Sequence, residues 1–523
     1  MNRKIKLISF SAIILIALMI ACDDYIDVEE VNRLDVESFY ETNEDADQAL
    51  IAVYDILQWH HNLQDWASPY MIKTLPSDEG TAGGENSSDQ LSYQAMDDMA
   101  WDEANSAILG VWSMNYWGVY RTNLVINNTE PDTDTKVRII AEARALRAYY
   151  YFELVSMFGD VPLILDELLL SEANKFRTPA SEIYAQIEQD LRDAIPDLPL
   201  KSAYSVADKF RISKGTAQSL LGKAYLYQQD YTNAASAFDE VINSGEYSLE
   251  ANFSDIFKED FEFGNESIFE TNFISTFGYD WGTDFSWGQR AESNIHIQLT
   301  GTREGLFYTF LTPDGDQQIV GWGFNYPSEK LYNAFDAADP RRDATVIDEA
   351  TYVASALAFA ESNDVDLSES DVSGDLSDVY DYTGYIRTKF ATKPSESTDA
   401  EGGVIPLNYG TNFRLIRYAD VLLLAAEAHN ATGNDAQAQN YLNQVRTRVG
   451  LGNISLTGED LFNAIEEERF VELAFEGHRY FDLVRWNLAD SELEGFEVGK
   501  HELLPIPLAE IQAAPALTQN DGY

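Results

Sequence analysis

Between Arg414 and Trp486 the sequence carries two successive helical pairs, and this stretch constrains the fold more than any other. In the first pair, small and apolar residues recur at the spacing of one helix face, and the second helix repeats that spacing up to Val449. The segment TGND at 432–435 interrupts the pattern and offers a cap for the second helix. The pattern therefore predicts a closely packed helical hairpin. The residues of the first face are Ala419, Leu422, Leu423, Ala426 and Asn430.

The second pair, residues 457–486, carries a stripe of charged side chains spaced by three or four positions. Such a stripe could be a carboxylate site for acid–base chemistry or a set of ion pairs that locks helix to helix. We favour ion pairs, because charge stripes with Arg nearby are usually structural. Thr457 and Asp460 predict a capping box, and Gly477 predicts a kink. The charged residues are Arg469, Glu472, Glu476, Arg479, Asp482 and Arg485.

The first 22 residues resemble a secretory signal that ends at a lipidated cysteine. Three cations among the first six residues precede an apolar run at 7–21, which is too short to span a membrane comfortably. The run ends in LMIAC, which is similar to a bacterial lipobox although Met19 replaces the usual Leu. Cys22 is the only cysteine, so no intramolecular disulfide can form. We therefore expect a lipid on Cys22, not an inert thiol, and a chain anchored to a membrane without spanning it.

The charge balance limits the classes of partner. The formal net charge is −53, and it becomes three units more negative without residues 1–21. Such a chain repels nucleic acid and anionic membranes at long range, and it disfavours strongly anionic polysaccharides. Solubility at high salt is an equally good explanation of this charge.

Helical periodicity is strong from residue 38 to about residue 250. The segment 214–249, KGTAQSLLGKAYLYQQDYTNAASAFDEVINSGEYSL, resembles a tetratricopeptide unit, and the 414–449 hairpin resembles one more loosely. Together with two weaker hairpins these units predict a degenerate array of helical pairs. Trp112, Tyr116 and Tyr120 are four positions apart, and we expect them in the core.

Residues 252–412 differ, because Gly, Asp, Ser and aromatic residues dominate and helical periodicity is rare. One helix is predicted there, capped by Ser328 and ended at Asp339-Pro340, and residues 362–381 are expected to form an acidic loop. The segments FGYDWGTDFSWGQR and QQIVGWGFNYPSEK place several Trp side chains among glycines. A Gly-rich loop can present a rigid aromatic platform at a low entropy cost.

No motif for phosphate binding, nucleophilic catalysis or zinc binding is present, and we expect no cofactor. Asp364-Val-Asp366 begins like a calcium loop, but Glu369 stands where glycine is required. A glycosidase needs two carboxylates across a cleft, and nothing singles out such a pair among the 88 acidic residues.

Four separated blocks resemble the SusD/RagB family, whose members are outer-membrane lipoproteins of Bacteroidetes that bind glycans for an import system. They are AEARALRAYYYFELVSMFGDVPL at 141–163, RYADVLLLAAEA at 417–428, NQVRTRVGL at 443–451 and ERFVELAFEGHRYFDLVRW at 468–486. LPIP and QNDGY near residue 523 are similar to the end of family members, so the chain is expected to be complete there.

The resemblance implies a mainly α-helical fold, in which tetratricopeptide-like hairpins are a scaffold and an irregular portion carries the ligand. After the signal peptide 1–21 and an acidic tether 22–37, residues 38–523 would form one domain, although length alone predicts about three. The scaffold would be 38–250 and 413–490, and the loop-rich portion 252–412, with residues 60–120 sharing the binding face. The partner would be a SusC-type TonB-dependent transporter, at the outside of the outer membrane, and the protein would have no catalytic activity.

Sugar rings present flat C–H faces that stack on aromatic side chains, so exposed aromatics in Gly-rich loops are candidates for glycan binding. Acidic residues outnumber cations there, which favours a neutral glycan such as a glucan or mannan. A surface glycoside hydrolase and the lid of a peptide importer are the alternatives. The candidate binding residues are Trp281, Trp287, Trp322, Trp66 and Tyr70.

Overall fold

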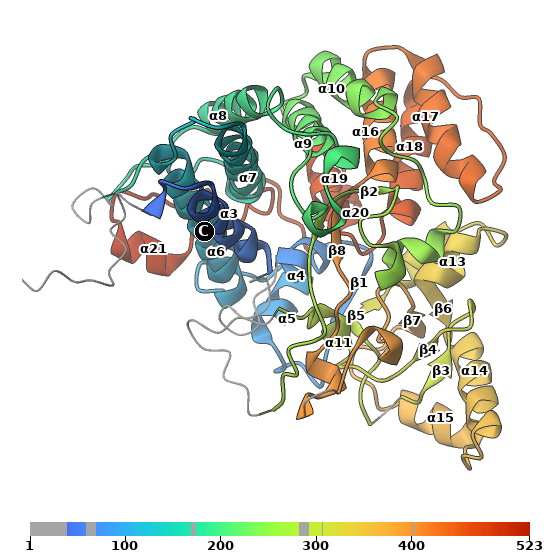
Figure 1. The fold of residues 1–523 in the computed structure, drawn as a ribbon. Coiled ribbons are helices and arrows are strands. Elements are labelled where there is room, and N and C mark those ends of the chain that lie inside the picture. Colours follow the sequence, from blue (N-terminus) through green and yellow to red (C-terminus); the bar gives the residue numbers. More distant parts are fainter. Residues whose placement is uncertain (1–38, 59–68, 169–173, 282–291, 306, 400–401) are drawn as a thin grey trace, which may run out of the picture.

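The computed structural model describes residues 39–58, 69–168, 174–281, 292–305, 307–399 and 402–523. Helical hairpins make up one side of the molecule, and short sheets joined by loops make up the other (Figure 1). The predicted mainly α-helical class is therefore confirmed. None of the described helices has both the length and the apolar character needed to cross a membrane. The signal, Cys22 and the acidic tether lie outside the described residues.

Neighbouring helices in the chain pack against each other, α6 with α7, α7 with α8, α9 with α10 and α16 with α17. The helices α10 and α16 join the first group of hairpins to the last. The bounds of these helices are α3 Asn43–Gln58, α6 Ser106–Asn128, α7 Asp134–Phe158, α8 Ala180–Ala194, α9 Lys214–Tyr227, α10 Tyr231–Asn243, α16 Tyr418–Ala431 and α17 Asp435–Arg448.

Small residues allow the helices α6 and α7, and α9 and α10, to approach closely. A Cβ on Gly222 of α9 would come within 2.5 Å of the Phe238 ring on α10. A Cβ on Gly118 of α6 would meet the Tyr150 ring of α7 at the same distance. Close packing of this kind depends on the absence of a side chain, because protein interiors leave little free volume.

The central helix α16 is buried on all sides. The sequence pattern predicted one apolar face, but every residue from Tyr418 to His429 is buried. Polar residues Asp420 and Glu427 are among them, and both are held in ion pairs described below. The difference arises because α9, α10, α17 and α18 (Gly458–Glu472) surround α16, so no face of it is left to solvent.

The segment 457–486 forms two helices, as the predicted second pair requires, and the chain between them is a turn and not a kinked helix. The helix α18 ends at Glu472, and α19 begins at Arg479 and ends at Arg485. Gly477 has φ +79°, a conformation that favours glycine, and lies in the turn that joins the two helices. The predicted capping box is wrong, because the Thr457 side chain makes no cap hydrogen bond. Asp435 of α17 instead accepts the Gly458 N–H at 3.0 Å.

Four two-stranded antiparallel sheets organise most of the loop-rich portion. They pair β1 with β5, β2 with β8, β3 with β4 and β6 with β7. The sheet of β2 and β8 leads directly into α16 and so connects this portion to the scaffold. The strands are β1 Gly80–Gly83, β2 Ser267–Thr271, β3 Phe310–Leu311, β4 Gln317–Gln318, β5 Phe324–Pro327, β6 Val346–Asp348, β7 Tyr385–Arg387 and β8 Phe413–Arg417.

The loop-rich portion contains more helix than the sequence predicted. Ser328 does cap a helix, but Pro340 begins another helix instead of ending that one, because proline fits the first helical turn. The predicted acidic loop holds a helix that Ser368 and Asp371 cap reciprocally. The short helices are α4 Pro69–Thr74, α5 Leu91–Asp97, α11 His296–Thr300, α12 Glu329–Ala334, α13 Pro340–Thr345, α14 Glu349–Ser362, α15 Glu369–Leu376, α20 Ala489–Glu492 and α21 Leu508–Ala513.

Single turns of 3-10 helix connect several of these elements, and most of the buried apolar residues belong to one large cluster. The main cluster of buried apolar residues runs from Tyr40 to Leu517 and includes both the scaffold and β2 and β8. A separate cluster lies under α14 and α15. The 3-10 turns are η2 Lys201–Ala203, η3 Val206–Asp208, η4 Phe253–Phe257, η5 Glu259–Phe261, η6 Pro394–Glu396 and η8 Ile405–Leu407.

Candidate functional site

Two of the predicted binding residues, Trp281 and Trp322, lie together in the loop-rich portion. Their ring centroids are 6.4 Å apart and the rings are tilted by 36°. Trp281 is 66% exposed, whereas Trp322 is partly buried against the main core. We call these two side chains the Trp pair. The exposure of Trp281 agrees with the expectation from its Gly-rich loop, and its role in binding stays a prediction.

Close backbone contacts explain why Trp322 stands between two glycines. Its N–H donates to the Gln298 carbonyl at 2.8 Å, at the end of α11. A Cβ on Gly321 would lie 2.5 Å from that same carbonyl oxygen. Gly323 has φ +74° and donates to the Gly301 carbonyl at 2.8 Å. The G-W-G motif therefore fixes the tryptophan backbone against α11, immediately before β5 begins.

The position of Trp281 is set by the segment before it. Asn408 accepts the Tyr279 N–H at 2.9 Å and donates its own amide to the Tyr279 carbonyl at 2.7 Å. The Tyr279 ring stacks on Phe277, with centroids 5.7 Å apart and planes 8° from parallel. Phe277 is 56% exposed, so aromatic surface extends from the Trp pair along this segment. The sequence analysis did not single out Phe277 or Tyr279, although both lie in the same Gly-rich motif.

A polar segment borders Trp322 on the side of β1. Gly84 donates its N–H to the Gly323 carbonyl at 2.6 Å, which brings the loop after β1 beside the Trp pair. Arg303 donates to the Trp322 carbonyl at 3.2 Å and forms an ion pair with Glu85 at 3.4 Å. The Glu85 side chain is 67% exposed. Aromatic faces and hydrogen-bonding groups thus lie next to each other, as recognition of a sugar requires.

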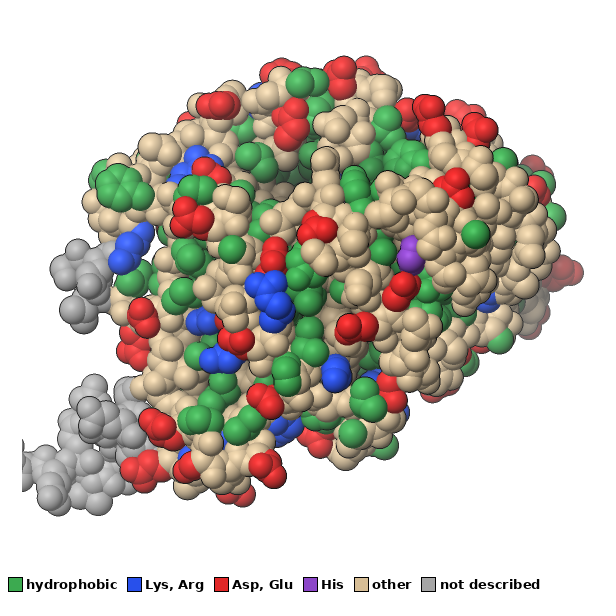
Figure 2. Space-filling view, turned by 90° about the horizontal axis from the view of Figure 1, so that it is seen from above, with side chains coloured by type: hydrophobic (Ala, Val, Ile, Leu, Met, Phe, Trp, Pro, Cys, Tyr) green, Lys and Arg blue, Asp and Glu red, His purple; other side chains and the backbone are tan. Residues whose placement is uncertain are grey.

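The charges near the Trp pair are mostly acidic. Asp280 is exposed beside Trp281, and Arg303, which contacts the backbone of Trp322, is already paired with Glu85. Asp314 and Asp316, two acidic residues of the loop-rich portion, form ion pairs with Lys258 at 3.0 and 3.4 Å. Their charges are therefore largely compensated. The face shown in Figure 2, seen from above the view of Figure 1, carries Asp and Glu side chains both at its rim and across its middle, with Lys and Arg side chains between them.

The remaining predicted residues do not join this surface. Tyr70 is 7% exposed, and its ring packs against Phe413 with centroids 4.6 Å apart. It lines a cavity of about 70 Å³ together with the ion pair of Lys73 and Glu153. Burial raises the pKa of Tyr70 to about 12. Tyr70 therefore offers no face to a ligand at the surface, and Trp66 and Trp287 lie outside the described residues.

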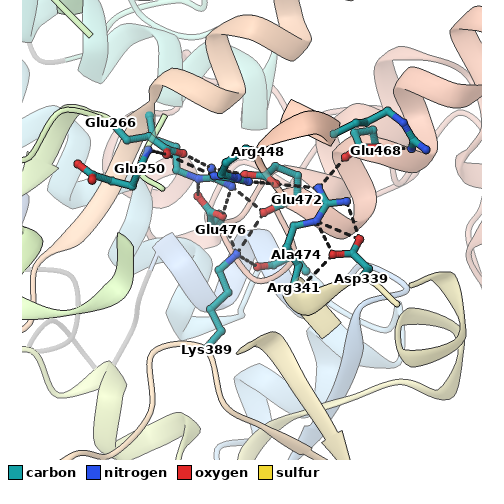
Figure 3. Close-up of polar contacts among 12 residues, drawn as sticks. Glu250, Glu266, Asp339, Arg341, Lys389, Arg448, Glu468, Glu472, Ala474 and Glu476 are labelled. Carbon is teal, nitrogen blue, oxygen red and sulfur yellow. Dashed lines mark hydrogen bonds and ion pairs between the residues drawn. The ribbon is translucent and has the colours of Figure 1, made fainter. Parts of the chain in front are cut away.

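The charged stripe of 468–485 is a buried network of ion pairs (Figure 3). Arg417 at the end of β8 binds Glu266, Glu472 and Glu476, each at 2.6–2.7 Å. Arg341 of α13 binds Asp339, Glu468 and Glu472 at 2.6–2.8 Å. Burial by itself raises the pKa of Glu472, but Arg448, Arg417 and Arg341 outweigh burial and hold that pKa well below its usual value.

The other members of the stripe are paired in the same way. Arg469 binds Asp420 and Asp482, both at 2.8 Å, and Arg485 binds Glu427 of α16. Arg479 binds Asp78 at 2.8 Å. Because every one of these charges has a partner and lies inside the protein, the structural interpretation is confirmed. The sequence did not show that most partners come from other segments. Among the described residues, no group of three or more His, Cys, Asp or Glu side chains could hold a metal ion.

Both the sequence and the fold of this chain are similar to those of known proteins. The sequence profile of the SusD family matches residues 265–523, a profile described as "Starch-binding associating with outer membrane" matches 24–226, and a tetratricopeptide profile matches 216–244. SusD-like protein P2 of Formosa agariphila is 28% identical over 98% of both chains.

Two solved structures are similar over nearly the whole fold. A laminarin-binding SusD-like protein is 34% identical, with a TM-score of 0.79 over 92% of this chain and 99% of that one. Surface glycan-binding protein A from Bacteroides thetaiotaomicron, solved in complex with laminarihexaose, is 27% identical, with a TM-score of 0.76 over 91% of this chain and 99% of that one.

Proposed function

Because this chain belongs to the SusD family, we propose that it captures oligo- or polysaccharide at the cell surface and passes it to a transporter. The observation that carries the proposal is the Trp pair, in which Trp281 is 66% exposed beside Trp322. A pyranose ring stacks on such a surface through its C–H groups. Arg303 and Glu85 lie beside Trp322, so their side chains are placed to form hydrogen bonds with the hydroxyl groups of the bound sugar.

A neutral glycan suits this surface best. A sulfated or uronate-rich chain would meet the carboxylates of Asp280 and Glu85, and the charge of Arg303 is compensated by Glu85. Like charges in direct contact repel each other, and dissolved salt screens this repulsion only in part. Stacking on the Trp pair requires no charge on the ligand, so the ligand class that fits is a glucan or a mannan.

Laminarihexaose is a suitable neutral probe, and its affinity is expected to change by less than about twofold between low and high salt, because no ion pair forms on binding. Isothermal titration at two ionic strengths measures this directly. A matched titration with a sulfated oligosaccharide should show no binding. Binding of the sulfated chain that collapses at high salt would contradict the neutral-glycan proposal but leave glycan capture standing.

Two other functions are separated by simple assays. A surface glycoside hydrolase would release reducing ends from laminarin or mannan, and we expect none above the buffer control. The lid of a peptide importer would bind peptides, so a peptide mixture should not compete with laminarihexaose. Release of reducing ends, or competition by the peptide mixture, would rule out the proposal of a non-catalytic carbohydrate-binding protein.

We further propose that the protein is lipid-anchored in the outer membrane, faces the exterior and acts with a SusC-type TonB-dependent transporter. The sequence motif ending at Cys22 supports the anchor. Residues 38–523 would form one domain, which the large core cluster from Tyr40 to Leu517 supports. Co-purification of the two proteins from detergent-solubilised outer membranes tests the partnership.

The Cys22→Ala variant is expected to leave the outer membrane, because one lipid modification at that residue is the anchor. The protein should appear in the soluble fraction or be retained with its signal uncleaved. Fractionation and surface labelling of intact cells measure both outcomes. If Cys22→Ala still fractionates with the outer membrane and is labelled at the surface, the anchor is elsewhere.

A further inference from the structure

A groove between α6 and α21 brings a second set of aromatic side chains to the surface. Its volume is about 320 Å³, within the range of small-ligand sites. We call it the α6–α21 groove. In Figure 1, α6 and α21 lie at the left, whereas β5, which directly follows Trp322, lies in the lower centre. Lining residues used below are Trp112, Tyr116, Tyr120, Asp166, Lys175 and Glu510.

The aromatic residues form a stripe on α6 that runs from the core to the solvent. Trp112 is 3% exposed, Tyr116 is half-buried and Tyr120 is 53% exposed. The sequence predicted all three as core, and that prediction is wrong for Tyr120. Residues four positions apart drift by about 40° per step around a helix of 3.6 residues per turn. The stripe therefore turns from the core at Trp112 toward the groove at Tyr120, while Thr122 and Val125 of the same helix stay buried. An exposed aromatic ring beside two others is a surface that a flat ligand can cover.

The walls of the groove are held in place by hydrogen bonds. On one side, Tyr116 donates to the Pro162 carbonyl at 2.9 Å, and Asn123 donates to the Ile164 carbonyl at 3.0 Å. On the other side, Asn174 accepts the Ala516 N–H at 2.8 Å. Neither wall needs to rearrange to admit a ligand, and a preformed site avoids the free-energy cost of ordering itself.

The groove also offers two charged side chains, Asp166 and Lys175, that are not engaged elsewhere in the described structure. Asp166 and Lys175 form no ion pair within the part of the chain that the structure describes. Glu510 is partly buried at the same groove and already accepts a hydrogen bond from Trp112 of the α6 stripe. The ammonium group of Lys175 as donor and the carboxylate of Asp166 as acceptor, beside aromatic rings, match a ligand with many hydroxyl groups and no net charge. An anionic ligand would face two carboxylates against one ammonium group.

We propose that the α6–α21 groove is a second glycan-binding site, in which a neutral sugar residue stacks on Tyr120 and bonds to Asp166 and Lys175. The inference rests on the proposed function of the Trp pair, because it assumes that glycans are the ligands of this protein. Two weak sites on one protein raise its apparent affinity for a glycan chain that is long enough to reach both sites. A short glycan reaches only one site, so the two sites bind short glycans independently of each other.

Titration with laminarihexaose and with laminarin tests the groove in the full chain. We expect two hexaose molecules per wild-type chain, one molecule for Tyr120→Ala, and two again for Tyr120→Phe, which keeps the ring. Tyr120 is exposed and its hydroxyl has no described partner, so neither change should disturb folding. For laminarin, Tyr120→Ala should lower the affinity roughly threefold to tenfold, the range expected for one lost stacking contact.

Trp281→Ala separates the failure of this inference from the failure of the proposed function. A wild-type stoichiometry of one, abolished by Trp281→Ala and unchanged by Tyr120→Ala, overturns the second site and leaves glycan capture intact. A chain that binds neither ligand overturns both. If Tyr120→Ala keeps two hexaose molecules but loses co-purification with the transporter, the groove is a protein contact and the inference is wrong.

Discussion

The Glu472→Ala variant is expected to lose about 3–5 kcal/mol of unfolding free energy, because removing one partner strands the other charges inside the protein. Glu472 is fully buried and binds Arg341 at 2.8 Å, Arg417 at 2.6 Å and also Arg448. These three cations come from α13, β8 and α17, so one carboxylate ties the loop-rich portion to the scaffold. Chemical denaturation followed by far-ultraviolet circular dichroism measures the loss.

Matched variants separate the buried charge from a general effect of mutation on α18. Glu467 is exposed on the same helix, and Glu467→Ala should change stability by no more than about 0.5 kcal/mol. Glu472→Gln keeps the shape and removes the charge, so it isolates the electrostatic part. Glycan affinity per folded molecule should be unchanged in all three variants. Lost binding at full stability would place the network in the ligand site.

The pH dependence of the unfolding free energy is a second measure of what the Glu472 carboxylate contributes. The pKa of Glu472 is lower in the folded protein than in the unfolded chain, where a glutamate titrates near 4.3. Its contribution to stability is therefore complete above that pH and is lost as the pH falls toward the folded pKa. The stability difference between wild type and Glu472→Gln should shrink on acidification below about pH 4. A constant difference down to pH 3 would show that the charge contributes nothing.

Removing either ring of the Trp pair is expected to weaken laminarihexaose binding by about 1–3 kcal/mol, which is roughly tenfold or more in affinity. Trp281→Ala should act only on binding, since this ring is 66% exposed. Trp322→Ala should also lower stability, because that ring packs against the core. Isothermal titration together with a thermal melt distinguishes the two effects.

A control for the Trp pair is Phe359→Ala, which removes a partly exposed aromatic ring from α14 and should leave the affinity unchanged. The double variant Trp281→Ala, Trp322→Ala shows whether the two rings contribute to binding independently, because rings with centroids 6.4 Å apart can stack on one sugar. A loss of affinity that differs from the sum of the two single losses indicates that they bind the same sugar. Wild-type affinity in both single variants would exclude the Trp pair as the platform. Trp287→Ala, at a residue outside the described structure, completes the set of predicted tryptophans.

The sequence by itself determined the fold class and the pairs of helices. Periodic apolar residues act through local spacing and can be found without knowing what lies opposite. The Gly-rich loop made Trp281 a candidate for exposure, and its 66% exposure in the structure agrees with that. The charge stripe was also recognised as structural from its spacing alone.

Tertiary structure decided which residues share a surface. Local spacing cannot show that Arg417 lies against Glu472 and Glu476, or that Arg303 lies beside Trp322, because chain segments far apart make these contacts. It also cannot show where the core ends. Tyr70 was expected at the ligand surface and is buried, whereas Tyr120 was expected in the core and is exposed. Both have the same chemical character, and only the elements packed around each ring determine whether solvent or protein covers it.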